Sequence, residues 1–378
     1  MPEMTQFKDK IPAAGGKVEF LHDTATGRLA SRISGTGFRA MYLVAVSLDG
    51  RQLLDTVPAM GIGQTAIYRQ PSLITYIQSD QQGMWGRNCP TCEKYFRTNH
   101  VMDFTFCPYC SEMAPSLAFI TKDQREYITA YYDAFARAYT TRNDTSLEMS
   151  EITDETSAWH YSEEKQQFHF KCETKKCQTE TDVLGRYGFC PRCGTTNSRT
   201  LFPEIIDKLL TRIQETKSSV PDRHQREPTW EQITISVLSE FEALAKHLRR
   251  RLLRFPMTPN RRKELETLNF QKPLLANECL VEWFDIGLLD WRGDDSAPPN
   301  AISSSEIPFI RKMIQRRHIL IHNGGLVDQE YLDLSGDTGV RLDERITIRS
   351  RETKRFLENI EAMGKNFLNN VEHGFGES

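Results

Sequence analysis

Eight of the nine cysteines in this 378-residue chain fall into four close pairs, and these pairs constrain the fold more strongly than any other feature. The first set contains Cys89, Cys92, Cys107 and Cys110, with fourteen residues between its two pairs. The second set contains Cys172, Cys177, Cys190 and Cys193, with twelve residues between its pairs. Two such pairs place four thiolates on two tight turns, which is the ligand arrangement of a tetrahedral zinc site. The sequence therefore predicts two zinc ribbons and two structural Zn²⁺ ions.

Each predicted zinc ion is structural, because four cysteines fill its coordination shell and leave no position for a substrate. A ribbon this short cannot bury enough apolar surface to fold alone, so metal binding would supply much of its folding free energy. Basic residues near the cysteines alternate with acidic ones, as Lys94 does with Glu93. Two roles stay open for the ribbons: a structural scaffold or partner-binding element, or a surface that contacts nucleic acid. The ninth cysteine, Cys279, is expected to be a buried apolar residue of a helix.

The overall charge argues against one simple kind of partner. The formal net charge is −3 at pH 7, so general electrostatic attraction to nucleic acid is excluded, and any such binding must use local basic patches. The chain has no run of about 18 apolar residues, and we expect no membrane span. Its first residues lack the apolar core of a signal peptide, so we expect a cytoplasmic protein. In that reducing compartment, paired cysteines indicate metal binding rather than disulfides.

The order of strand, cysteine and helix patterns predicts a multidomain α+β chain. Met41–Ser47 has the apolar, β-branched composition of a strand. A polar, proline-containing stretch at 217–228 is the clearest predicted domain boundary. The predicted parts are a β-rich N-terminal region at 1–84, a first zinc ribbon at 85–114, a helix and linker at 115–157, a second zinc ribbon at 158–200, a helix and linker at 201–228, and an all-α domain at 229–378.

The C-terminal domain has the periodicity of several amphipathic helices. Thr229 has the position of a helix cap, and the helix that it opens runs to about Leu253. A later helix begins near Ser305 and ends before Gly324, which can adopt the left-handed conformation of a C-cap. Ser350 caps the last helix. The segment between these last two helices, 326–349, is predicted as a variable insert, and the whole domain as an up-and-down bundle of four or five antiparallel helices.

One helix of this domain carries a polar motif at its C-terminal end. His318 and His322 lie one turn apart on a polar stripe, Arg317 lies between that stripe and the apolar one, and Asn323 follows. Histidine suits proton transfer because its ordinary pKa is near 6.5, and arginine suits phosphate because its planar group binds two oxygens. A structural role is the alternative, since cations near a helix C-terminus are stabilised by the helix dipole and a histidine pair could simply satisfy backbone carbonyls.

The sequence Arg317-His318, followed after three residues by His322-Asn323, resembles the motif of the HEPN family of small α-helical domains. The resemblance covers residues 230–375. It implies an HEPN-like helical bundle that cleaves RNA without a metal, acting as a homodimer in which two motifs face one cleft. It further implies that Arg317 holds the phosphate, that His322 is the acid or base, that His318 orients or assists, and that Asn323 adds a hydrogen bond.

The predicted function is therefore a metal-independent endoribonuclease of HEPN type, which uses the 2′-hydroxyl of RNA and leaves a 2′,3′-cyclic phosphate. Chains built in this way resemble prokaryotic toxins and anti-phage defence effectors, so RNA is the expected substrate and a defence-system protein an expected partner. The alternative is a non-catalytic adaptor, in which the ribbons bind nucleic acid or protein and the helical domain only dimerises.

Overall fold

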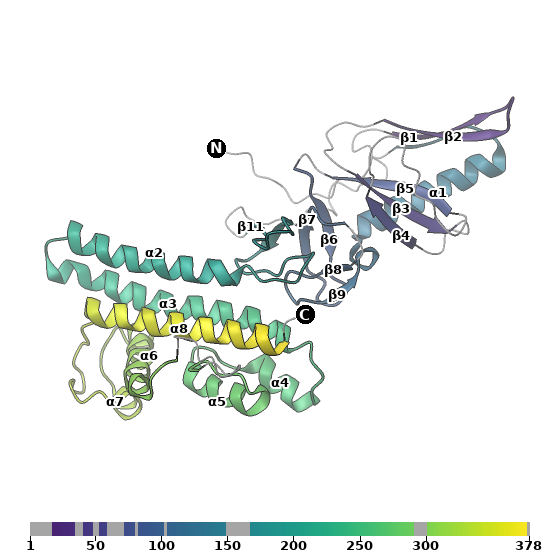
Figure 1. Cartoon of the computed structure of the whole chain (residues 1–378). Helices are drawn as coiled ribbons and strands as arrows, with labels where there is room; N and C mark the ends of the chain where they lie inside the picture. Colours follow the sequence, from purple (N-terminus) through teal and green to yellow (C-terminus); the bar gives the residue numbers. More distant parts are fainter. Residues whose placement is uncertain are drawn as a thin grey trace. The chain divides into compact units, whose positions relative to one another are not determined.

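The computed structural model describes residues 17–34, 41–47, 53–58, 72–79, 82–101, 104–148, 167–290 and 301–375. The chain divides into an N-terminal unit, residues 1–195, and a C-terminal unit, residues 196–378. Figure 1 shows that the strands belong to the first unit and that the second is built from helices. The predicted α+β class, with a β-containing N-terminal region and a helical C-terminal region, is confirmed.

Two three-stranded antiparallel sheets form the first part of the N-terminal unit. One has the strand order β10-β1-β2 and the other the order β4-β3-β5. Their strands are β1 (Lys17–Asp23), β2 (Arg28–Ser34), β3 (Met41–Ser47), β4 (Leu53–Pro58), β5 (Ser72–Gln78) and β10 (Thr145–Glu148). The predicted strand Met41–Ser47 is thus confirmed as β3. The stretch 115–157, predicted to end in a linker, instead contributes β10, whose residues pair with β1.

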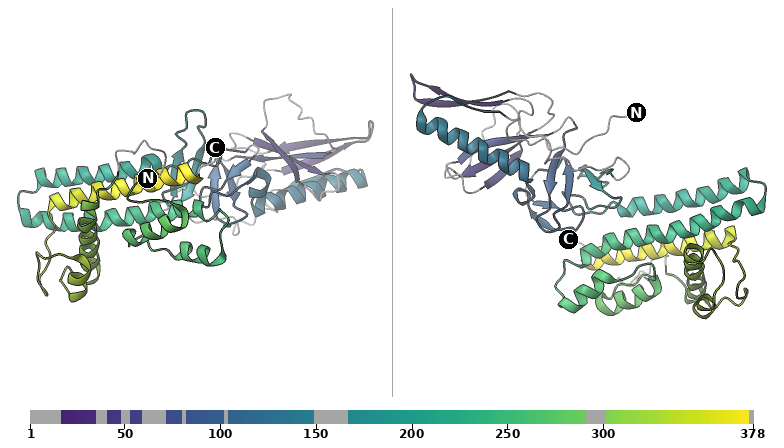
Figure 2. Two further views of the ribbon diagram at one scale, coloured as in Figure 1. Left: turned by 60° about the horizontal axis from the view of Figure 1, so that its bottom comes forward. Right: turned by 180° about the vertical axis from the view of Figure 1, so that it is seen from behind.

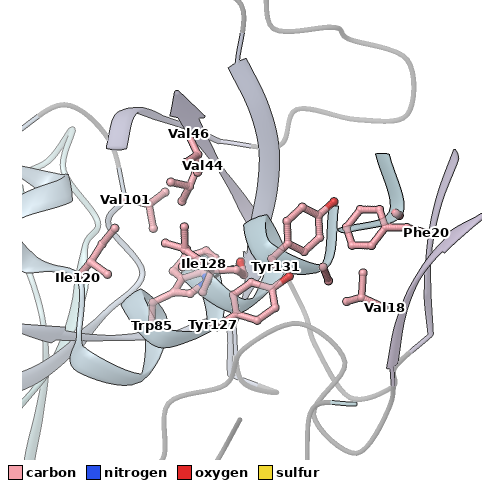
Figure 3. Close-up of a cluster of buried hydrophobic side chains, with 13 residues drawn as sticks. Val18, Phe20, Val44, Val46, Trp85, Val101, Ile120, Tyr127, Ile128 and Tyr131 are labelled. Carbon is pink, nitrogen blue, oxygen red and sulfur yellow. Dashed lines mark hydrogen bonds between the residues drawn. The ribbon is translucent and has the colours of Figure 1, made fainter. Parts of the chain in front are cut away.

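Helix α1 (Lys122–Thr141) packs against both sheets and supplies much of their apolar core. Figure 3 shows Tyr127 and Tyr131 of this helix among the buried side chains of the strands. The rings of Tyr131 and Phe20 meet edge to face, with centroids 5.0 Å apart. The helix was predicted from residue 115, but it begins at Lys122, because the Thr121 side chain and Gln124 form a capping box there.

The two predicted ribbons are joined in one four-stranded antiparallel sheet of order β11-β12-β7-β6. The first ribbon supplies β6 (Trp85–Asn88) and β7 (Tyr95–Thr98), and the second supplies β11 (Gln167–Lys171) and β12 (Glu180–Leu184). Strands β8 (Phe104–Phe106) and β9 (Met113–Pro115) form a separate hairpin. The strands of both predicted ribbons are therefore parts of one sheet, although residues 158–166 lie outside the described ranges and residues 196–200 belong to the C-terminal unit.

Three long helices lie side by side in the C-terminal unit: α2 (Ser198–Ser219), α3 (Arg223–Leu252) and α8 (Ser350–Phe375). The views in Figures 1 and 2 agree on this arrangement. The linker predicted at 217–228 is wrong, because only residues 220–222 separate α2 from α3. The Asp222 side chain accepts a hydrogen bond from the His224 N–H and caps α3, so Thr229 lies inside that helix instead of opening it.

Shorter helices pack beside this layer: α4 (Pro259–Thr267), α5 (Pro273–Phe284), α6 (Ile307–His322) and α7 (Gln329–Ser335). Figures 1 and 2 show α6 running across the direction of α3 and α8, so the up-and-down arrangement predicted for the domain does not extend to α6. The predicted insert at 326–349 contains α7, which packs on α6. Helix α6 ends at the predicted glycines, with Gly324 at φ 59°.

Candidate functional site

All four cysteine pairs of the N-terminal unit close in the same way. In each pair, the N–H of the first cysteine donates a hydrogen bond to the carbonyl of the residue two positions after the second cysteine. The four bonds are Cys89 to Lys94 (3.1 Å), Cys107 to Glu112 (2.8 Å), Cys172 to Thr179 (2.8 Å) and Cys190 to Thr195 (2.8 Å). The residue directly after each pair has a positive φ; these residues are Glu93, Ser111, Gln178 and Gly194. The wider pair, Cys172 and Cys177, therefore forms the same kind of turn as the three narrow pairs.

The sulfur atoms of each set are gathered at one point. In the first set, Cys89 and Cys110 are 3.6 Å apart, as are Cys92 and Cys107. In the second set, the corresponding distances are 3.5 Å, for Cys172 to Cys193 and Cys177 to Cys190. A tetrahedron with zinc–sulfur bonds of about 2.3 Å has sulfur atoms about 3.8 Å apart, close to these distances. Each set could hold one zinc ion, as predicted.

The crowding of four sulfur atoms in the first set opposes the ionisation of all four thiols. A hydrogen bond from the Cys107 thiol lowers the pKa of Cys92. Burial, in contrast, raises the pKa of the Cys107 thiol itself. Four sulfurs so close together cannot all ionise unless a positive charge lies between them, and a bound zinc ion would supply that charge.

The two cysteine sets are related by an approximate two-fold symmetry. The Phe106 N–H donates to the Pro191 carbonyl at 2.7 Å, and the Phe189 N–H donates to the Pro108 carbonyl at 2.9 Å. Each phenylalanine directly precedes a ligand cysteine, and each proline directly follows one. The strand order β11-β12-β7-β6 has the same symmetry, because β12 and β7 pair at its centre. The ribbons thus form a fused pair.

A buried ion pair lies at the centre of this fused sheet. Arg97 of β7 and Asp182 of β12 are 2% and 3% exposed, and their Nη1 and Oδ2 atoms are 3.7 Å apart. The Asp182 carboxylate also contacts His169 Nδ1 of β11 at 2.7 Å. That hydrogen bond raises the pKa of His169 above its ordinary value. Three strands from both ribbons therefore meet in one charged cluster.

The motif of the C-terminal unit lies at the end of α6. Arg317, His318 and His322 line one cavity of about 200 Å³. Both histidines are exposed, and their ring centroids are 4.6 Å apart. Arg317 is 8% exposed, and its Nη1 donates to the Gln271 side-chain oxygen at 3.1 Å. The Nε of Arg317 is buried and makes no hydrogen bond to any described residue.

A relay of side chains holds Arg317 in place. Gln271 donates its amide to the Glu242 carboxylate at 2.9 Å, and Lys246 pairs with the same carboxylate at 2.6 Å. Burial alone would raise the pKa of Glu242, but the hydrogen bonds from Lys246 and Gln271 outweigh it and keep that pKa low. Burial lowers the pKa of Arg317, and the charge of Glu242 opposes that effect. Arginine stays protonated under these conditions, so the cavity contains a fixed positive charge.

Arg316 and Asn323 lie close to the motif residues in sequence, but they make hydrogen bonds or ion pairs outside the cavity. Arg316 is buried and pairs with Asp337 at 2.8 Å and with Glu352 at 3.0 Å, so it holds α6 against the following loop and α8. The Asn323 amide donates to the Leu326 carbonyl at 2.8 Å, and Asn323 is not among the described residues that line the cavity. The structure therefore places Asn323 in the turn after α6.

Comparisons with protein-family models, with curated proteins and with solved structures found no match to this chain. Among the helices in the described part of the chain, none has the length and apolar content needed to cross a membrane. Gln271, Glu242 and Lys272, which hold Arg317 or line its cavity, were not predicted. No spacing pattern could have indicated them, because Gln271 lies 46 residues from Arg317 and meets it only through tertiary packing.

Proposed function

We propose that this protein is a metal-independent endoribonuclease of HEPN type, with Arg317, His318 and His322 at its active site. The observation that carries the proposal is that all three side chains line one cavity. The exposed histidines can reach a substrate, and the Arg317 Nε has a hydrogen that no described residue accepts. The contrast with Arg316, whose charge is matched by two carboxylates, supports a ligand-binding role for Arg317.

The chemistry follows from these groups. A neutral histidine takes the proton of the RNA 2′-hydroxyl, and the 2′-oxygen then bonds to phosphorus. The bond from phosphorus to the 5′-oxygen breaks, and a protonated histidine gives its proton to that leaving oxygen. Arg317 binds the phosphate oxygens as negative charge develops on them. The products are a 2′,3′-cyclic phosphate end and a 5′-hydroxyl end.

The position of the two histidines supports a homodimer. In-line attack places the incoming and leaving oxygens on opposite sides of phosphorus, so the base and the acid must approach from opposite sides. The His318 and His322 rings lie one turn apart on a single helix, with centroids 4.6 Å apart and planes tilted by 47°, so they approach a phosphate from the same side. A second copy of the chain would supply the group on the other side. His322 is the principal acid or base, and His318 assists it.

We also propose that the two cysteine sets bind zinc and that both ions are structural. Four sulfur ligands complete each site, so no step of RNA cleavage runs through the metal. Because the chain resembles toxins and anti-phage defence effectors, we also propose that its biological role is of that kind, with RNA as the substrate.

The test is RNA cleavage by the purified full-length protein in the presence of a chelator, with zinc content measured in the same buffer. We expect wild type to leave cyclic phosphate ends. Arg317→Ala and His322→Ala should each lose about a hundredfold or more in rate, the usual contribution of a group that stabilises transition-state charge and of a catalytic acid or base, respectively. Arg262→Ala and His224→Ala are matched controls, because both residues are exposed and neither lines the cavity.

The positioning relay gives a finer test. Gln271→Ala removes the hydrogen bond to Arg317 without removing its charge. We expect kcat to fall about tenfold with little change in KM, since the misplaced arginine would stabilise the transition state less. Equal rates of RNA cleavage by wild type, Arg317→Ala and His322→Ala would refute the assignment of the active site to this cavity. An intact dimer that never cleaves RNA but binds it would favour the non-catalytic adaptor.

A further inference from the structure

A second, larger cavity adjoins the motif cavity. Its volume is about 390 Å³, within the range of about 300–1,000 Å³ that is typical of small-molecule sites. The two cavities share four lining residues, which are Lys272, Ile314, Gln315 and Leu334. Helix α6 forms a common wall, so a ligand that touches the motif can extend along α6 into the larger space.

The lining of the larger cavity combines apolar walls with positive charge. Leu275 and Leu334 are 53% and 47% exposed, an unusual degree for large apolar side chains. Lys272 and Arg311 line the same space, and within the described part of the chain neither makes an ion pair. Apolar walls can cover the face of a nucleobase, and the cations attract the phosphates on either side of it.

The remaining polar groups suit the edge of a base. Gln315 can both donate and accept hydrogen bonds. Asp333 accepts one hydrogen bond from Gln329 at 2.8 Å and has a second carboxylate oxygen that can accept another. A carboxylate would repel phosphate but can accept a hydrogen bond from the amino group of a base. The cavity thus offers groups of the kinds that a nucleoside requires.

We infer that this larger cavity is a nucleoside subsite, which binds the RNA nucleotide next to the phosphate held by Arg317. The inference rests on the proposed ribonuclease function and names its substrate class: unpaired, single-stranded RNA, since a paired base could not enter the cavity. Lys272 and Arg311 bind the backbone, and the leucine walls cover the base. The subsite adds binding energy beside the reacting atoms and contributes no proton transfer.

The test measures binding separately from cleavage. The probe is a fluorescently labelled hexanucleotide with 2′-O-methyl groups, which cannot be cleaved through its 2′-oxygens, and the readout is fluorescence anisotropy with the full-length protein. Arg311→Ala removes a cation, and Leu334→Trp fills the cavity. We expect each to raise Kd about tenfold, the usual effect of losing one charged hydrogen bond or one stacked base. With cleavable RNA, Arg311→Ala should raise KM and leave kcat nearly unchanged, because Arg311 lines the larger cavity and not the motif cavity.

Matched controls and the mass of the assembly separate the outcomes. Arg262→Ala and Leu342→Trp alter an exposed arginine and an exposed leucine that do not line the cavity, and both should keep the wild-type Kd. If Arg311→Ala and Leu334→Trp bind the probe as wild type does, the subsite is refuted even where RNA cleavage is confirmed. If they weaken binding while no variant cleaves RNA, the subsite stands and the ribonuclease proposal fails. A Leu334→Trp protein that binds normally but no longer dimerises would assign the leucines to a protein contact and overturn the inference.

Discussion

The buried charge cluster between the ribbons offers the sharpest test of how the N-terminal unit is held together. Asp182 of β12 faces Arg97 of β7, and both are almost fully buried. We consider Asp182→Leu, which removes the carboxylate but keeps a side chain of similar volume. Arg97 then remains charged inside the sheet and loses its contact with the Asp182 carboxylate.

The size of the effect follows from the geometry. At 3.7 Å the two charges attract by about 4 kcal/mol with an effective dielectric constant of about 20. Desolvation cancels much of that gain, so the pair adds little net stability. Removing one partner of a buried ion pair, however, typically costs about 3–5 kcal/mol. The opening equilibrium of the sheet should therefore rise by between about two hundred and a few thousand fold.

Hydrogen exchange measured by mass spectrometry on the full-length protein reports this opening directly. In Asp182→Leu, we expect the exchange rates of the β7 and β12 amides to increase by the same factor as the opening equilibrium. The double variant Arg97→Met with Asp182→Leu should return most of the protection, because it removes both buried charges. Asp133→Leu, at an exposed position on α1, serves as the control. A change below tenfold in the single variant, or equal exchange in the single and double variants, would refute the assigned role of the pair.

Three further perturbations test the two units. Cys190→Ser should reduce the bound zinc measured by mass spectrometry from two ions toward none, because the two sets share backbone hydrogen bonds; a variant that keeps one full equivalent would show independent sites. Since the pKa of His169 is raised above 6.5, the stability that its charged form contributes is complete below pH 6.5 and is lost as pH rises through the raised pKa. The difference in melting temperature between wild type and His169→Gln should therefore shrink over that pH range, and a constant difference would contradict the linkage. Gly364→Ala would drive a Cβ into the ring of buried Phe202 and should destabilise the helical unit by about 1–3 kcal/mol, whereas Gly374→Ala on the same helix meets nothing and should be neutral or slightly stabilising by calorimetry.

The cysteine turns could be predicted from sequence because their chemistry is local. A close cysteine pair determines its own turn, and the spacing of two pairs closes one tetrahedral site. The approximate two-fold symmetry could not be predicted in the same way. It depends on hydrogen bonds between Phe106 and Pro191 and between Phe189 and Pro108, which lie about eighty residues apart in the chain. No local pattern encodes such a contact, so the ribbons were predicted as separate domains.

In the helical unit too, local features could be predicted from the sequence and long-range contacts could not. The C-terminal end of α6 was predicted from Gly324, because a left-handed residue after an amphipathic run is a local signal. The stretch 217–228 was predicted as a linker from its polarity and its two prolines, but most of it is helical and its polar residues are largely exposed. Polarity indicates exposure in a helix as much as in a loop. The partners of Arg317 lay beyond sequence analysis because tertiary packing alone brings Gln271 to it.

The division of the chain into two units also separates its two kinds of chemistry. Both cysteine sets lie within residues 1–195, and every residue that lines the motif cavity lies within 196–378. Zinc with four sulfur ligands is coordinatively saturated, so a zinc ion held by either cysteine set would be suited to a structural role. The cavity beside α6 contains a fixed arginine and two exposed histidines, which are groups that transfer protons and bind phosphate without a metal. Metal removal and motif substitution are therefore separable perturbations: the first should unfold the ribbons, and the second should act on the helical cavity alone.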